Sequence, residues 1–295
     1  MKQTCLAAIA CALVACGSDL EDGSRIDKLR LLALRADEPF AHAGEAIALQ
    51  LLLVQPDPQP LSYALATCTR PSGSTVQGCL AALDGPFRPL AIEDDHFTLD
   101  IADDALTHLP ASARPSALVG AVIVACPGEI ADGTTAALPL ACRDPDGARL
   151  PLDAFEVGVK RIFLRERDRN QNPEIVSVRW DGEAWPEDRV PEARACEHAN
   201  DDIDNCEREL KHAIHVETSE AERGVDENGT RFAEQLVVQF YATQGVFERP
   251  LRVATQADNH WAAQRLPTTD TAQLWFVVRD DRGGVGWTRR QVRVR

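Results

Sequence analysis

The sequence predicts an all-β protein made of two antiparallel β-sandwiches in tandem. Short apolar runs recur along the whole chain and are separated by clusters of Pro, Gly, Asp and Asn, a spacing typical of sandwich strands. Helix patterns are scarce over the same span. The length of 295 residues also favours two domains over one.

Six strands are predicted in the first half of the chain. One alternates strictly, with Phe97, Leu99 and Ile101 facing inward. Another is almost entirely apolar, as expected for a central strand that is covered on both sides. The six strands cover residues 28–36, 45–54, 61–69, 96–101, 116–126 and 155–166.

Two other segments of the first half are predicted to have different structures. Residues 103–110, "DDALTHLP", fit a single helical turn that Asp103 or Asp104 would cap. Residues 127–154 carry no clear strand pattern and are predicted to form a long loop.

The second half repeats the strand character of the first. Within one of its segments Leu236, Val238, Phe240 and Ala242 share a face. The last two strands are joined by the short sequence "DRGG", residues 281–284, which is typical of a hairpin turn. The predicted strands cover residues 174–180, 211–217, 233–243, 247–255, 272–280 and 285–294.

The N-terminus has the pattern of an export signal. A lysine precedes the apolar run "CLAAIACALVA", which is shorter than the roughly 20 residues that cross a bilayer. The sequence Leu13-Val14-Ala15-Cys16 resembles the lipobox of bacterial lipoproteins. That resemblance implies cleavage before Cys16, a diacylglycerol on its sulfur and an acyl chain such as palmitate on its amino group. Gly17, in place of Asp, favours the outer membrane.

These observations divide the chain into five parts. We expect a signal peptide at 1–15, a lipidated cysteine and flexible tether at 16–26, and a first sandwich at 27–167. The polar stretch "DRNQNP", residues 168–173, is the predicted linker, and the second sandwich covers 174–295.

The cysteines support export. Nine are present, of which Cys5 and Cys11 would leave with the signal and Cys16 would take the lipid. An even number remains, which in an exported chain predicts disulfides. No C-x-x-C motif with zinc-ligand spacing occurs. Because the six remaining cysteines lie in three close couples, we expect the bridges Cys68–Cys79, Cys126–Cys142 and Cys196–Cys206.

Charge and motifs exclude several functions. The formal net charge is −15, which disfavours binding to nucleic acid phosphates or to anionic lipid surfaces. Signatures of hydrolases, zinc proteases and nucleotide-binding enzymes do not occur in the sequence. We therefore expect no enzymatic activity and no cofactor.

Two segments resemble parts of bacterial immunoglobulin-like and cadherin-like modules. "RADEPFAHAGEAIALQLLL", residues 35–53, is similar to the opening of such a module, and the C-terminal strands joined by "DRGG" are similar to its closing hairpin. The resemblance implies two immunoglobulin-like sandwiches in tandem after the lipoprotein signal. The Trp and Cys spacing of antibody domains does not occur here.

Calcium is a possible ligand at two places. The linker is similar to a cadherin calcium motif through Asp168, Asn170 and Asn172, although Gln171 replaces an acid. The alternative interpretation is a plain linker. The loop 196–206 gathers carboxylates that either bind a hard cation or remain hydrated. Its candidate ligands are Asp201, Asp202 and Asp204. We expect neither site to bind calcium tightly.

All five tryptophans lie in the second half of the chain. Trp275 alternates with core-facing neighbours and is predicted to face outward, near Trp287 and Arg279. Exposed rings beside an arginine could stack on a sugar or on a protein partner. The alternative is that these rings are structural.

Three functional hypotheses follow. The first is a non-catalytic, lipid-anchored envelope protein that presents two sandwiches as a spacer or binding module. The second is adhesin-like recognition of a glycan or an envelope protein through the tryptophan-rich domain. The third, an envelope enzyme with an unrecognised site, is disfavoured.

Overall fold

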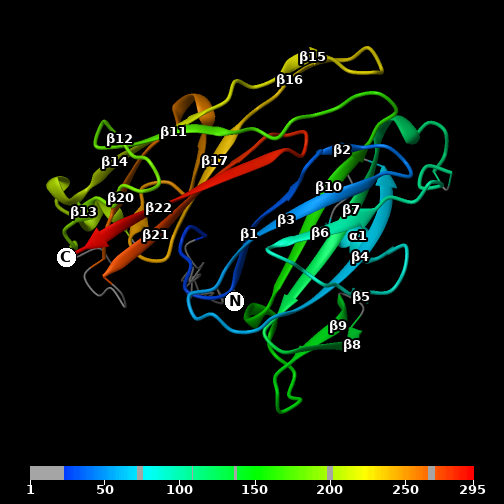
Figure 1. Cartoon of the computed structure of the whole chain (residues 1–295), viewed down its shortest axis with the longest axis horizontal. Coiled ribbons are helices and arrows are strands. Elements are labelled where there is room, and N and C mark those ends of the chain that lie inside the picture. The colour runs from blue at the N-terminus through cyan, green and yellow to red at the C-terminus, as the bar shows by residue number, and fades with distance from the viewer. Residues whose placement is uncertain (1–22, 72–75, 108, 136–137, 198–201, 265–269) are drawn as a thin grey trace, which may run out of the picture.

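The computed structural model consists of two β-sandwiches that lie side by side (Figure 1). It describes residues 23–71, 76–107, 109–135, 138–197, 202–264 and 270–295. Strands predominate, and a short helix, α1 (Val76–Leu80), occurs in the first sandwich. The predicted fold class, two antiparallel sandwiches in tandem, is confirmed.

The first sandwich packs a three-stranded sheet on a five-stranded sheet. The smaller sheet has the order β1 (Arg30–Ala36), β3 (Ala46–Val54), β6 (His96–Asp100). The larger has the order β2 (Phe40–Ala41), β10 (Glu156–Leu164), β7 (Ala117–Cys126), β4 (Ser62–Pro71), β5 (Arg88–Pro89). Alternation along β6 buries Phe97 and Leu99, and every residue of β7 is buried, as the sequence pattern predicts.

The second sandwich packs two five-stranded sheets. One has the order β12 (Glu183–Ala184), β11 (Ile175–Trp180), β14 (His212–Thr218), β20 (Asp258–Ala262), β18 (Val246–Phe247). The other has the order β13 (Glu192–Ala193), β22 (Val285–Val294), β21 (Thr271–Arg279), β17 (Val237–Ala242), β19 (Leu251–Val253). Large rings fill its core, where Trp180 contacts Trp185 and Trp261 at centroid distances of 4.8 and 5.9 Å.

Each sandwich closes in the same way. A short early strand runs parallel to the last strand: β2 lies beside β10 in the first sandwich, and β13 lies beside β22 in the second. The other strand pairs within the four large sheets are antiparallel. A short early strand of each sandwich thus lies in the same sheet as its last strand, an immunoglobulin-like arrangement.

Several local predictions were wrong. Residues 24–26, predicted as the end of a flexible tether, are hydrogen-bonded to Ala242 on β17, and Ile26 is buried. The described residues of 103–110 form hydrogen-bonded turns in place of the predicted helical turn. The N–H and the hydroxyl of Thr107 both donate to the carbonyl of Asp104. The predicted loop at 127–154 contains the hairpin β8 (Glu129–Thr135) and β9 (Leu138–Arg143). Pro250 lies between β18 and β19, which replace one predicted strand.

Additional short elements complete the described chain. A second hairpin, β15 (Arg223–Val225) and β16 (Arg231–Ala233), extends from the second sandwich. Single 3₁₀ turns occur at Arg114–Ser116, Leu152–Ala154, Ile203–Asn205, Arg208–Leu210 and Ala254–Gln256.

Three disulfides fasten local segments. Their Cα–Cα distances are 5.4 Å for Cys68–Cys79, 5.7 Å for Cys126–Cys142 and 5.6 Å for Cys196–Cys206. The first attaches α1 to β4 against Gly120, where a Cβ atom would lie 2.8 Å from both sulfurs. A glycine is therefore required on β7 at this bridge.

Candidate functional site at the joint between the sandwiches

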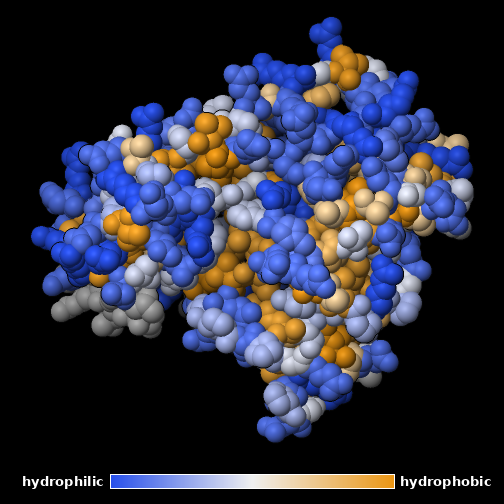
Figure 2. Space-filling view, viewed as in Figure 1, coloured by the Kyte–Doolittle hydropathy of each residue, from blue (hydrophilic) through white to orange (hydrophobic). Residues whose placement is uncertain are grey.

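The two sandwiches meet along an apolar surface, called the joint here. In the first sandwich, one face of β1 and β3 fills the domain's own core, and the other face packs against the outer face of β21 and β22. Figure 2 shows apolar side chains gathered toward the middle of the molecule, with hydrophilic ones around them. The main apolar residues of the joint are Ile26, Leu32, Ala33, Val54, Trp275, Val277 and Val285.

Trp275 is part of this joint. Its ring points away from the core residues Leu274 and Phe276, as predicted, but only 4% of it is exposed because β1 covers it. Trp287, opposite Val277 on the neighbouring strand, is half-buried, with the Arg35 guanidinium 4.7 Å from its ring centroid. Of the two alternatives for Trp275, Trp287 and Arg279, an open ligand surface is therefore wrong, and the structural role agrees with the burial of Trp275 and the arginine over Trp287.

Arg279 also holds the joint together. Its side chain donates to the carbonyl of Leu32 across the joint at 2.5 Å and to Gln239 within its own sheet at 2.7 Å. Both bonds use the guanidinium that the sequence had suggested for ligand binding. The arginine thus spans the two sandwiches.

The sequence contains a signal for the joint in the third strand, β3. The run Leu51–Val54 is apolar at four consecutive positions, and a strand with one solvent-facing side would alternate instead. Leu51 faces the core, whereas Leu52 and Val54 face the second sandwich. A continuous apolar run predicts a strand that is buried on both faces.

The tip of the β21–β22 hairpin inserts against the linker and the first sandwich (Figure 1). Asp280 folds the tip by accepting from the N–H groups of Arg282 at 2.8 Å and Gly284 at 2.7 Å. A Cβ atom on Gly284 would lie 2.8 Å from the carbonyl oxygen of Gln171. The glycine of "DRGG" therefore permits close contact with the linker.

Arg282 joins rings from both sandwiches at this tip. Its guanidinium carbon lies 3.7 Å from the ring centroid of Phe232 on β16 and 4.8 Å from that of Phe40 on β2. The same side chain forms ion pairs with Glu234 at 3.2 Å and Glu222 at 3.4 Å. The charge of Arg282 is thus balanced while its flat face stacks.

Lys160 reaches the same tip from the first sandwich. Only 6% of this β10 residue is exposed, and its Nζ donates to the carbonyl of Gly283 at 2.5 Å. Burial, reinforced by the nearby Arg279 charge, lowers the pKa of Lys160 to about 7, although Asp280 acts in the opposite direction.

The β15–β16 hairpin supplies a second polar contact. The Glu227 carboxylate accepts from the backbone N–H groups of Glu166, Arg167 and Asp168, the shortest bond being 2.8 Å. In return Asp168 accepts from the Glu227 N–H at 2.7 Å. Burial opposes ionisation, but these backbone bonds outweigh it and lower the pKa of Glu227.

The linker side chains bind protein groups on both sides. Asn172 donates to the carbonyls of Ala36 and Asp37 and accepts from the Val285 N–H at 2.9 Å. Arg169 binds Glu45, and this hydrogen bond is the main cause that lowers the pKa of the glutamate. The sequence "DRNQNP" thus forms a linker that is hydrogen-bonded to both sandwiches.

The calcium candidates are not brought together. Oxygens of Asp168 and Asn172 already accept from backbone N–H groups, and Asn170 is buried with its amide near Asp280. Asp202 accepts from the N–H of Asp204, whose carboxylate lies 3.4 Å from Lys211; Asp201 lies outside the described residues. In the described ranges, no group of three or more His, Cys, Asp or Glu has metal-binding geometry.

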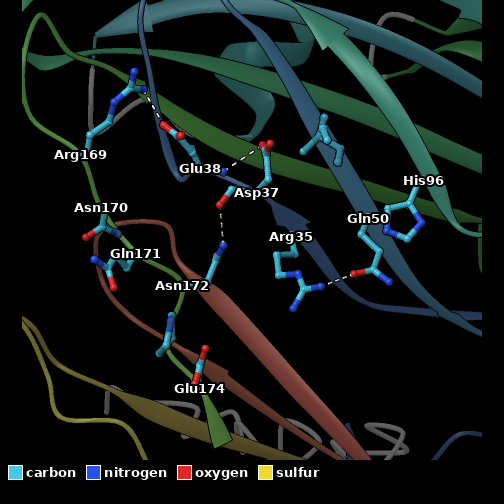
Figure 3. Close-up of a pocket in the computed structure, with 13 residues that line it drawn as sticks. Arg35, Asp37, Glu38, Gln50, His96, Arg169, Asn170, Gln171, Asn172 and Glu174 are labelled. Atoms are coloured by element: carbon cyan, nitrogen blue, oxygen red, sulfur yellow. Dashed lines mark hydrogen bonds and ion pairs between the residues drawn. The ribbon is translucent and has the colours of Figure 1, made fainter.

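A polar cleft of about 560 Å³ opens beside the linker (Figure 3). Arg35 donates to Gln50 on one side, and Arg169 lies 2.6 Å from Glu38 on the other. The side chain of Asn172 reaches the backbone of Asp37 between them. Side chains of both charges line the cleft, and Arg169 and Glu38 form an ion pair, so the cleft has no single charge character.

Comparisons with known proteins do not assign a family. No protein-family model and no curated protein match the chain. Among solved structures, a red sea bream transglutaminase aligns with TM-score 0.24 and 10% identity, over 92% of this chain and 32% of that one. The D0-D1 domain of intimin aligns with TM-score 0.22 and 10% identity, over 89% of this chain and 98% of that one. DIP-gamma IG1+IG2 aligns with TM-score 0.20 and 11% identity, over 90% of this chain and 97% of that one. These scores are too low to support an argument about function.

Proposed function

We propose that this chain is a non-catalytic, lipid-anchored envelope protein that presents two firmly docked β-sandwiches as a spacer or binding module. The joint is the observation that carries this proposal. It buries Trp275, and the linker, the β21–β22 tip and the β15–β16 hairpin add polar contacts around it. We place the domains at 27–167 and 174–295, with 168–173 as the connecting segment.

The anchor is part of the proposal. Cys16 and the rest of the lipobox lie outside the described residues. Within the described part of the chain, no helix is long and apolar enough to cross a bilayer. Three disulfides are typical of exported proteins. Attachment through two or more acyl chains at Cys16 would hold the protein stably at a membrane.

The test of the anchor is Cys16→Ser. We expect wild-type protein to incorporate labelled palmitate and to sediment with membranes, and the variant to do neither. Membrane attachment that persists in the variant, without label, would refute lipid anchoring.

The test of firm docking is a distance measurement. Spin labels at Leu152→Cys and Val176→Cys, both well exposed and one in each sandwich, would be introduced in the soluble Cys16→Ser background. We expect one narrow distance distribution at pH 9. A broad distribution would show that the sandwiches move independently and would overturn the spacer proposal.

A further inference from the structure

Lys160 is an unusual residue in its position. It shares a face of β10 with the buried Ile162 and Leu164, whereas the neighbouring Arg161 is exposed. Lysine rarely occupies such a site because its ammonium loses hydration there. Its amine donates a hydrogen bond to the carbonyl of Gly283 in the other sandwich.

The surroundings of Lys160 do not neutralise a positive charge. On β21 and the hairpin tip that follows it, Arg279 is a like charge that acts against the Lys160 ammonium, and Asp280 is an opposite charge that favours it. The Asp280 carboxylate is already bound by two turn N–H groups and by Asn170. Arg161 and Asp281 line the same surface pocket as Lys160. In the part of the chain that the structure describes, no carboxylate forms an ion pair with Lys160.

We propose that Lys160 makes docking of the two sandwiches proton-dependent: a proton added to Nζ weakens the joint, and opening the joint exposes the amine to water. When Lys160 is neutral, its amine donates to the carbonyl of Gly283 and no charge is buried at the joint. An ammonium in the same place faces Arg279 without an ion-pair partner. The proposal rests on the docked arrangement and is independent of where the protein is anchored.

The direction of the pH effect follows from linkage. In the docked form the pKa of Lys160 is about 7, and in water it is 10.5. Between these values the open form binds one more proton, so docking weakens as pH falls from about 10.5 toward 7. The docking equilibrium constant should fall about tenfold per pH unit within this window and be independent of Lys160 below it.

The first test is an NMR titration of ¹³Cε-labelled lysine in the Cys16→Ser protein. Only four lysines are present, so Lys160 is assigned by the signal that disappears in Lys160→Met. We expect this signal to titrate near pH 7 and to remain near pH 7 in Arg161→Met. Titration of this signal near pH 10.5, the value for a lysine in water, would overturn the inference.

The second test connects the proton to the joint. Trp275→Asp should open the joint and raise the pKa of Lys160 from about 7 toward 10.5. Gly284→Ala provides a milder opening variant. The spin-label distances should broaden between pH 9 and pH 7 in wild type but not in Lys160→Met.

The outcomes of the second test separate the two proposals. Two results would refute the role of Lys160. One is an equal pH dependence of the spin-label distances in wild type and Lys160→Met. The other is a Lys160 pKa that stays near 7 in a variant whose distances show an open joint. A narrow distance distribution that does not change with pH would refute this inference alone. Broad distributions even at pH 9 would refute the docked spacer itself.

Discussion

At the residue scale, the two tryptophans of the joint should differ in their contribution to stability because they differ in burial. Trp275 is 4% exposed, whereas Trp287 is half-buried beneath Arg35. Trp275→Ala should lower the free energy of unfolding by about 3 kcal/mol or more, as for a buried tryptophan. Trp287→Ala should cost about 1 kcal/mol. Guanidinium unfolding of both variants measures the difference, and equal losses would contradict the assigned burial.

Asn172 is the linker residue that binds both sandwiches. Asn172→Ala removes the donor to Ala36 and the acceptor of the Val285 N–H. We expect a loss of about 1–3 kcal/mol in unfolding free energy, because buried partners remain unpaired. Gln171→Ala, at the exposed neighbouring position, is the matched control and should change stability by less than about 0.5 kcal/mol.

Calcium should not stabilise the protein appreciably. A ligand at hundredfold excess over its Kd adds about 2.7 kcal/mol to the native state, which would raise Tm by several degrees. Since Asp168 and Asn172 already bind protein N–H groups, we expect no such shift with millimolar calcium compared with chelator. An increase of about 5 degrees that sodium at equal ionic strength does not reproduce would show a calcium site.

At the scale of elements, the β21–β22 tip depends on glycine for its fit. A Cβ at Gly284 would collide with Asp280 and approach Gln171 and Pro173. Gly284→Ala should therefore destabilise the protein by about 1–3 kcal/mol through overpacking. Gly85→Ala is the control, because no atom lies within 4 Å of a Cβ there. Similar melting curves for both variants would argue against close contact at the tip.

Sequence pattern predicted most long strands because each alternates or is fully apolar over enough residues. The β8–β9 hairpin was missed, since Gly and Pro interrupt its pattern and a register shift lies within it. The joint was also missed. Trp275 was correctly oriented within its own sheet, but its cover, β1, is more than 200 residues away in the sequence. Local periodicity contains no information about such a partner.

At the scale of the whole molecule, the joint should couple the two sandwiches during unfolding. Separating them would expose Trp275, Val277 and the outer face of β1. We expect one calorimetric transition whose van't Hoff and calorimetric enthalpies agree. Trp275→Asp should split it into two. Two resolved transitions in wild type would indicate that the joint contributes little to stability.

The start of the described chain does not enter the first sandwich directly. Ile26 donates to the carbonyl of Ala242 on β17 at 2.8 Å, and Ala242 donates back to Ser24 at 2.9 Å, so residues 24–26 lie along the second sandwich before β1 begins. A mechanical load applied at the N-terminus would therefore reach β17 first and act along these parallel hydrogen bonds in shear. The linker would carry little of that tension until residues 24–26 detach, and the two sandwiches would share the force as one body.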